Sequence, residues 1–353
     1  MINLIKLKAK SLFPGYFALV MATGALSLAA YYQGMIAFSK LLVYFNVLAY
    51  LFLSLLTIVR LFKYFQCIKK DLSSHTRGPG FFTLVAGSCI LGSQLVIVEN
   101  HYLLATFLWG ISILLWFVIM YAFFAVITMR KDKPPLAEGV NGAWLITAVS
   151  THAVSILGTL LSSEMRFSEF VLFFSLCMYL LGCMLYLQII TIIFYRFTFL
   201  EFKLAALTPP YWINMGAVAI TTLAGATLML HTQNWSFLVE IAPFLKGFTL
   251  FFWVTGTWWI PLLFILTIWR HLYHRYPLTY SPQFWGLAFP LAMYTTSTYQ
   301  LSKALNISFL NIIPQFMIYI AIAAWLCGLY ALIKHLFFET RGHFNYVKKE
   351  SSF

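Results

Sequence analysis

The chain has 353 residues, of which 61% are hydrophobic and only 9% are charged, and its mean hydropathy is +0.84. A water-soluble domain carries about 25% charged residues, so this composition excludes a soluble globular protein and indicates an integral membrane protein. The net charge of +13 comes from basic residues dispersed over short connections. That distribution argues against nucleic-acid binding and is typical of loops that face anionic membrane lipids.

Apolar stretches near 20 residues long, the length that crosses a roughly 30 Å hydrocarbon core, recur along the whole chain. They predict an all-α membrane protein with ten transmembrane helices. No linker or low-complexity segment divides the chain, so residues 1–353 are predicted to form a single transmembrane domain. The predicted spans are about 13–32, 38–62, 80–98, 102–128, 142–162, 170–195, 210–230, 244–269, 283–304 and 313–336.

The basic residues orient these spans. With a cytoplasmic N-terminus, every one of the 23 lysines and arginines falls on the cytoplasmic side except Lys40, Arg166, Lys246 and Lys303. By the positive-inside rule, this asymmetry predicts a multi-pass protein of the cell (inner or plasma) membrane with both termini in the cytoplasm. The five cysteines show no CxxC spacing, so neither a disulfide framework nor a metal site is predicted.

The odd-numbered spans open alike, which predicts a five-fold repeat of helical hairpins. The openings are PGYF at 14–17, PGFF at 79–82, NGAW at 141–144, PPYW at 209–212 and PQFW at 282–285. Proline suits the first turn of any helix, so ordinary helix starts are the alternative interpretation. The odd spans are also rich in Gly, Ala, Ser and Thr, whereas the even spans carry large apolar side chains. We therefore predict a quasi-five-fold arrangement whose odd-numbered helices line a central pore, although small residues also serve close helix packing.

Within the ninth span, Phe289 and Pro290 are the candidate pore gate. Alignment of the span starts puts Phe289 at one level with mostly small residues on the other odd spans, so its ring is predicted to close the pore by excluding water. These candidate pore-lining residues are Met21, Ala86, Ala148 and Gly216. Pro290 frees a backbone carbonyl, which is tolerable where a helix faces protein or water. A packed core phenylalanine beside a routine membrane proline is the alternative.

Beyond the gate, Tyr294, Thr296 and Thr298 are the candidate pore-lining donors. Uncharged O–H groups suit an anion that must both enter and leave, although such hydroxyls often bond back to their own helix. No lysine or arginine lies deep in any predicted span. His152 is the one deep histidine, and it is interpreted either as a pH sensor or proton relay or as an interhelical hydrogen-bond partner. An enzyme or haem protein would need clustered His, Asp or Glu, so no enzymatic activity or cofactor is predicted.

Three motifs resemble the tellurite-resistance/dicarboxylate transporter family: FPGYFALVMATG at 13–24, GTWWIP at 256–261 and YSPQFWGLAFPLAMYTTSTYQL at 280–301. That family includes bacterial tellurite-resistance proteins, yeast malic acid and sulfite transporters and plant slow anion channels. The resemblance implies a pore of five inner helices, a homotrimer with one pore per subunit, and an occluding phenylalanine at the position of Phe289. From the dozen residues that precede the first span, the long phosphorylated tails of the plant channels are not expected here.

The preferred function is channel-like transport of small anions or organic acids through a pore that Phe289 occludes. The alternative is a secondary carrier for a C4-dicarboxylate, sulfite or tellurite oxyanion, proton-coupled through His152. Membrane lipids and small anions are the expected partners.

Overall fold

The structure is a computed structural model that describes the backbone of residues 2–201, 204–277 and 280–350, and the side chains of residues 6, 8–201, 204–277 and 280–337. These residues form helices and connecting turns, with no β-strand among them. Nine helices of this described part are long and apolar enough to cross a membrane. Helix α13 (Trp285–Leu305), which corresponds to the predicted ninth span, is long enough but more polar, because hydroxyl side chains fill its second half.

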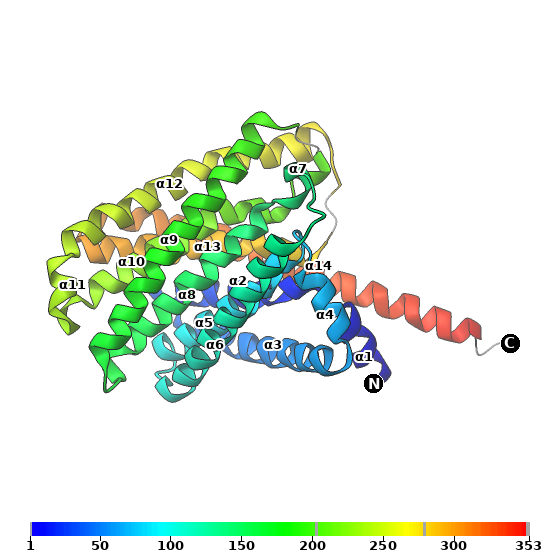
Figure 1. Cartoon of the computed structure of the whole chain (residues 1–353), viewed down its shortest axis with the longest axis horizontal. Coiled ribbons are helices and arrows are strands. Elements are labelled where there is room, and N and C mark those ends of the chain that lie inside the picture. The colour runs from blue at the N-terminus through cyan, green and yellow to red at the C-terminus, as the bar shows by residue number, and fades with distance from the viewer. Residues whose placement is uncertain (1, 202–203, 278–279, 351–353) are drawn as a thin grey trace.

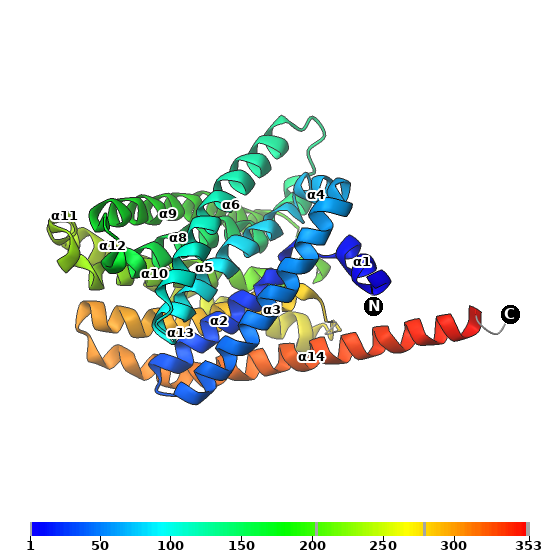
Figure 2. The ribbon, with the colours of Figure 1, turned by 90° about the horizontal axis from the view of Figure 1, so that it is seen from below.

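Among the described residues, ten helices of 15 or more residues alternate along the chain between an inner and an outer set, as their contacts show. Figures 1 and 2 show these helices side by side in one bundle. The inner helices are α2 (Ala18–Tyr32), α5 (Phe82–Ile97), α8 (Ile146–Leu161), α10 (Ile213–Leu230) and α13. The outer helices are α3 (Ile36–Lys63), α6 (Tyr102–Met129), α9 (Ser168–Phe199), α12 (Ala242–Ile268) and α14 (Ile312–Glu350). Their bounds agree with the predicted spans within a few residues over most ends, because span length and helix-start signals are local properties of the sequence.

The five inner helices close a ring. Helix α2 contacts α5, α5 contacts α8, α8 contacts α10, α10 contacts α13, and α13 returns to α2. Each outer helix packs on the inner helix that precedes it: α3 on α2, α6 on α5, α9 on α8, α12 on α10 and α14 on α13. The short helices α1 (Ile2–Ser11), α4 (Phe65–Leu72), α7 (Leu136–Gly139) and α11 (Ser236–Glu240) lie before the ring or in its connections.

The repeated opening motif forms the same local structure in every hairpin. Each inner helix starts with a 3₁₀ turn, and these turns also contact one another in a closed ring. They are η1 (Pro14–Phe17), η2 (Gly78–Phe81), η3 (Gly142–Leu145), η6 (Pro209–Trp212) and η9 (Pro282–Phe284). Four of them hold proline near the first position, where its missing N–H needs no partner. In η3, the side chain of Asn141 accepts a hydrogen bond from the Ala143 amide instead, which caps the turn without proline.

Burial follows the composition of the two sets of helices. The membrane-length windows of α2, α5, α8 and α10 are 83–94% buried, whereas those of the outer helices are 22–56% buried. Small side chains on the inner helices allow backbones to approach closely, and the large apolar side chains of the outer helices remain exposed, as lipid-facing surfaces require. The difference in composition therefore reflects position in the bundle.

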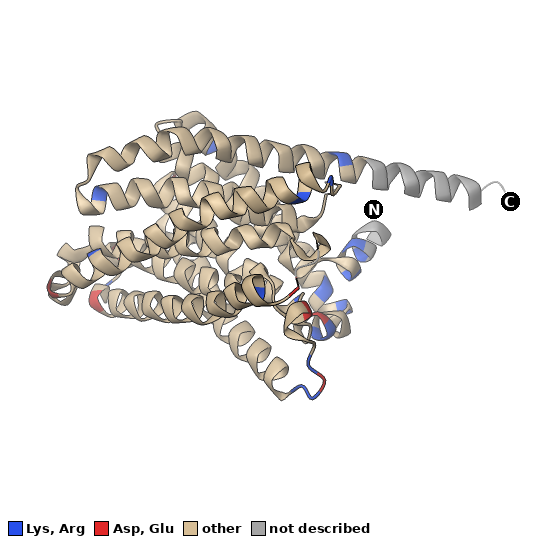
Figure 3. Ribbon diagram, turned by 90° about the horizontal axis from the view of Figure 1, so that it is seen from above, with Lys and Arg blue, Asp and Glu red and all other residues tan. Residues whose placement is uncertain are grey.

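Charged residues gather at the two ends of the bundle, and most lysines and arginines lie at the end that carries the N-terminus (Figure 3). There, Arg60 at the end of α3 donates a 2.7 Å hydrogen bond to Asp71, and Arg77 binds the same carboxylate. At the opposite end, Lys40 lies 3.9 Å from Glu99. The described side chains of the inner helices carry a single charge, at Lys303 near the end of α13.

Candidate functional site

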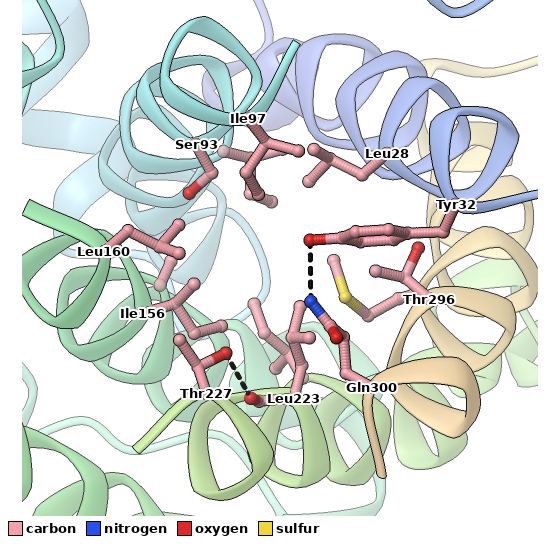
Figure 4. Close-up of a pocket in the computed structure, with 14 residues that line it drawn as sticks. Leu28, Tyr32, Ser93, Ile97, Ile156, Leu160, Leu223, Thr227, Thr296 and Gln300 are labelled. Carbon is pink, nitrogen blue, oxygen red and sulfur yellow. Dashed lines mark hydrogen bonds between the residues drawn. The ribbon is translucent and has the colours of Figure 1, made fainter. Parts of the chain in front are cut away.

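A small cavity lies inside the ring, and residues from all five inner helices line it (Figure 4). Its volume is about 20 Å³, enough for about one water molecule. The lining consists of Leu28, Tyr32, Ile90, Ser93, Ile97, Ala153, Ile156, Leu160, Ile220, Leu223, Thr227, Met293, Thr296 and Gln300. Since none of these side chains is ionisable except the Tyr32 phenol, the cavity is electrically neutral.

Tyr32 and Gln300 join α2 to α13 at this cavity. The Gln300 Nε2 atom donates a 2.6 Å hydrogen bond to the Tyr32 hydroxyl. Figure 4 shows the Tyr32 ring projecting into the cavity with its hydroxyl turned toward Gln300. The ring also stacks on Tyr299 at a centroid distance of 5.1 Å, which holds it in place. Tyr32 and Gln300 therefore narrow one side of the cavity with a polar bridge.

The three smaller hydroxyl groups of the lining bond to their own helices. Ser93 and Thr227 donate to the carbonyl oxygens four residues earlier, at 3.0 and 2.7 Å. The Thr296 hydroxyl donates to the carbonyl oxygen of Ala292, also four residues earlier, at 3.1 Å, and it lies 3.3 Å from the carbonyl oxygen of Ala25 on α2. Such back-bonding is common for hydroxyls in membrane helices. A hydroxyl must therefore rotate away from its carbonyl before it can donate to an anion.

Phe289 lies one helical turn before Met293, and its side chain is only 1% exposed. Phe289 is not among the residues that line the cavity. Because residues four apart share a helix face, spacing from Met293 favours the cavity-facing side of α13 for Phe289, nearer the start of the helix. By the same spacing, Ala86 lies one turn before Ile90 of the lining. Helix periodicity thus favours an orientation of the Phe289 ring toward the ring axis.

Gly216 and Pro290 bring α10 and α13 into close contact. A Cβ atom on Gly216 would lie 2.6 Å from the Cγ of Pro290 and 3.2 Å from its Cα, which is too close without displacement. Gly216 also precedes Ile220 of the lining by one turn. The absence of a side chain at Gly216 therefore lets the proline segment of α13, next to Phe289, pack directly on α10.

The two remaining residues expected at the level of Phe289 are Met21 and Ala148, and both are buried. Met21 lies two turns before Leu28, on the face of α2 that lines the cavity. On α8, the residue one turn before Ala153 is Val149. Ala148 is rotated about 100° from Val149, so helical spacing favours Val149 at this level.

Tyr294 and Thr298 face α12, outside the cavity lining. The Tyr294 hydroxyl lies 2.8 Å from the Thr257 hydroxyl, and the Trp253 indole donates a 3.0 Å hydrogen bond to Thr298. The cavity-lining residues of α13, by contrast, follow the three- and four-residue spacing of a single face, and Thr296 belongs to that face. Hydroxyl content alone did not separate these two faces of the helix.

His152 of α8 contacts α9 and α10, and it is also outside the cavity lining. Its Nδ1 atom is 3.3 Å from the Thr221 hydroxyl and its Nε2 atom is 3.7 Å from the Cys183 sulfur. The imidazole meets the Tyr179 ring edge to face, and a Cβ atom on Gly182 would lie 2.6 Å from the imidazole. These contacts are typical of an interhelical residue, and the missing side chain at Gly182 leaves room for the His152 imidazole. The described residues include no group of three His, Cys, Asp or Glu side chains placed to hold a metal ion.

Sequence reasoning missed Tyr32 and Gln300, as well as the aliphatic residues of the cavity. The aliphatic positions follow from the hairpin alignment, since Ile90, Ile220 and Met293 lie one turn beyond Ala86, Gly216 and Phe289. The Tyr32–Gln300 bridge has no such signal, because it joins helix ends separated by 268 residues.

Comparison with known proteins places the chain among membrane transport proteins. Residues 11–333 match the family model described as voltage-dependent anion channel. An uncharacterized transporter of Methanocaldococcus jannaschii is 24% identical over 335 residues, which cover 93% of this chain and 96% of the relative. A second uncharacterized transporter of that organism is 25% identical over 312 residues, covering 86% and 87%. An uncharacterized membrane protein of Mycobacterium tuberculosis is 35% identical over 152 residues, 43% of this chain and 77% of that protein.

Proposed function

The chain belongs to the voltage-dependent anion channel family, and from this we propose that it conducts anions passively through a central pore gated by Phe289. The family match agrees with the resemblance of its span motifs to a transporter family that includes the plant slow anion channels. Anion transport in general follows from the family and from the relatives named as transporters. In this proposal the ten long helices cross the membrane as five hairpins, and the inner ring surrounds the conduction path.

One observation carries the proposal: the five inner helices close a ring around a neutral cavity. Phe289 is buried, and helical spacing puts it one turn before that cavity on the same face of α13. A hydrophobic constriction blocks ions by excluding water, so one ring at this level is enough to close a narrow pore. By helical spacing, Gly216 and Ala86 lie at the corresponding level on two other inner helices, and both are small residues.

The neutral lining favours transient passage. A fixed positive charge in the conduit would hold an anion tightly, whereas dipoles and hydroxyl groups bind it weakly enough for release. Small inorganic anions or organic acids are the proposed substrates. The basic residues at the N-terminal end of the bundle raise the local anion concentration there. We place both termini in the cytoplasm of a cell membrane and the chain in a homotrimer with one pore per subunit.

Recording from the purified chain in planar bilayers tests the gate. Phe289→Ala should raise the anion conductance by about tenfold or more, since a barrier lowered by about 1.4 kcal/mol gives that factor. Chloride, nitrate and malate are presented in turn to rank the substrates. Phe252→Ala is the matched control, because Phe252 is equally buried but packs on Tyr186 and Phe248 outside the inner ring.

Equal currents in wild type and Phe289→Ala would contradict the gate. Saturable, pH-driven malate uptake into proteoliposomes without any conductance would contradict the channel and favour the secondary carrier. Loss of that uptake in His152→Ala would then assign the proton coupling to His152.

A further inference from the structure

Three arginines occupy corresponding places near the ends of outer helices. Arg60 lies in the last turn of α3, Arg196 lies in the last turn of α9, and Arg270 follows α12 in the π-helical turn η8 (Trp269–Tyr273). Their side chains are 3%, 5% and 9% exposed. A guanidinium removed from water costs several kcal/mol unless charges or hydrogen bonds compensate it. The partners of each arginine are therefore informative.

Two of the three arginines are compensated within the chain. Arg60 donates to the Asp71 carboxylate at 2.7 Å. Arg196 donates to the carbonyl oxygen of Val140 and to the hydroxyl of Tyr211. In these two hairpins the protein itself supplies the hydrogen-bond acceptors.

Arg270 differs from both. Its Cζ atom lies 4.3 Å from the centroid of the Tyr276 ring, which covers one face of the guanidinium. Among the residues that the structure describes, none forms an ion pair with Arg270 or accepts a hydrogen bond from its side chain. The Nε atoms of all three arginines are buried without a hydrogen-bond partner, so what sets Arg270 apart is the lack of an acceptor for its terminal nitrogens. The ring attracts the cation but leaves the N–H donors, which lie in the plane of the guanidinium, unpaired.

Arg270 lines a pocket of about 280 Å³, a volume close to the lower end of the roughly 300–1,000 Å³ range of ligand sites. Arg270, Thr208 and Ser281 contribute polar groups, while Trp212, Leu266 and Leu287 contribute apolar surface. The walls come from the end of α12 and from the starts of α10 and α13. The pocket shares no lining residue with the central cavity.

We propose that the Arg270 pocket binds the phosphate-type oxyanion of an anionic membrane lipid. A guanidinium fork matches the geometry of a phosphate, and basic pockets between membrane helices are sites for anionic headgroups. The lipid source follows from the apolar surface that adjoins the pocket. Phe264 of α12 is 39% exposed, and its ring packs edge to face on the lining residue Trp212 at a centroid distance of 5.0 Å. An acyl chain therefore lies against apolar side chains while its headgroup reaches Arg270.

Thermal melting of the detergent-purified full chain tests this site. Added phosphatidylglycerol should raise the Tm by about 2–4 °C relative to phosphatidylcholine, since a ligand that binds only the folded state stabilises it. Arg270→Gln should abolish the difference. Arg275→Gln, which removes the same charge from an exposed position five residues away, should preserve it. Native mass spectrometry should show phosphatidylglycerol adducts that Arg270→Gln loses.

The remaining outcomes decide the source of the oxyanion. If inorganic phosphate alone gives the same Arg270-dependent shift, the lipid assignment is overturned in favour of a soluble anion. If both variants lose the shift equally, or wild type shows none, the site itself is overturned. Leu287→Trp fills the pocket and keeps the charge, so it should also lose the shift. If Arg270→Gln fails to fold, Leu287→Trp takes its place in the test.

Discussion

The central cavity and the Arg270 pocket differ in charge more than in the residues around them. Both have mostly apolar walls, yet the central cavity holds no cationic side chain and the Arg270 pocket centres on a buried guanidinium. A fixed cation holds an anion, whereas a neutral wall with a few dipoles lets it pass. The comparison indicates that a lining without fixed charge suits passage, and that a buried cation beside the ring suits retention.

The largest effect is expected from a charge placed in the central cavity, because it removes the difference in charge between the two sites. Met293→Lys would bury an ammonium among apolar side chains at a position that is 1% exposed. An unpaired buried ion costs several kcal/mol, a large share of the roughly 5–15 kcal/mol that stabilises a folded protein. We expect little folded protein in size-exclusion chromatography.

Met293→Leu is the control, because a similar apolar volume usually costs less than about 1.5 kcal/mol. A Met293→Lys protein that folds as well as wild type would show that water reaches this position, and it would contradict a closed neutral cavity.

A smaller effect is expected from the contact between α10 and α13. Gly216→Ala brings a methyl group to 2.6 Å from the Pro290 Cγ, so the two helices must shift, at a cost of about 1–3 kcal/mol. The shift also moves the segment that carries Phe289, and we expect a raised basal anion leak. Thermal melting and bilayer recording measure the two effects.

Gly286→Ala is the matched substitution on the partner helix. The nearest atoms to a Cβ at Gly286 are 3.5 Å away, which is ordinary contact. Alanine is favoured over glycine within a helix by about 0.5–1 kcal/mol. Gly286→Ala should therefore raise the free energy of unfolding, whereas Gly216→Ala should lower it. Equal destabilisation by both substitutions would contradict a special role for the contact between Gly216 and Pro290.

The smallest effect concerns the polar bridge of the central cavity. Tyr32→Phe and Gln300→Leu each remove the 2.6 Å hydrogen bond, and each should cost about 0.5–1.5 kcal/mol. A double-mutant cycle in thermal melting should give a coupling energy near 1 kcal/mol, because the second substitution has no bond left to remove. Additive losses would mean that the two side chains act independently.

The long helices could be read from the sequence because their signals are local. Apolar length predicted the spans, and the proline-aromatic openings predicted where the inner helices start. The third hairpin opens with NGAW and lacks the proline. The structure explains this exception, because Asn141 caps the turn. Charge asymmetry likewise predicted the basic end of the bundle (Figure 3).

The rotation of each helix about its own axis was harder to predict from the sequence. Phe289 and Thr296 share the cavity-lining face of α13 by helical spacing, but Tyr294 and Thr298 turn to α12. His152, the most conspicuous polar residue of the spans, contacts α9 and α10. A count of hydroxyl groups does not contain this information.

By itself, the sequence determined that the chain is a helical membrane protein, where its long helices run and which of them carry small side chains. Those properties depend on residues within one or two helical turns. Only the tertiary structure decided which face of each helix meets the cavity, that Tyr32 meets Gln300, and that Arg60 finds an acidic partner while Arg270 faces an open pocket. Such contacts depend on the packing of several helices at once, and residues far apart in the chain supply them.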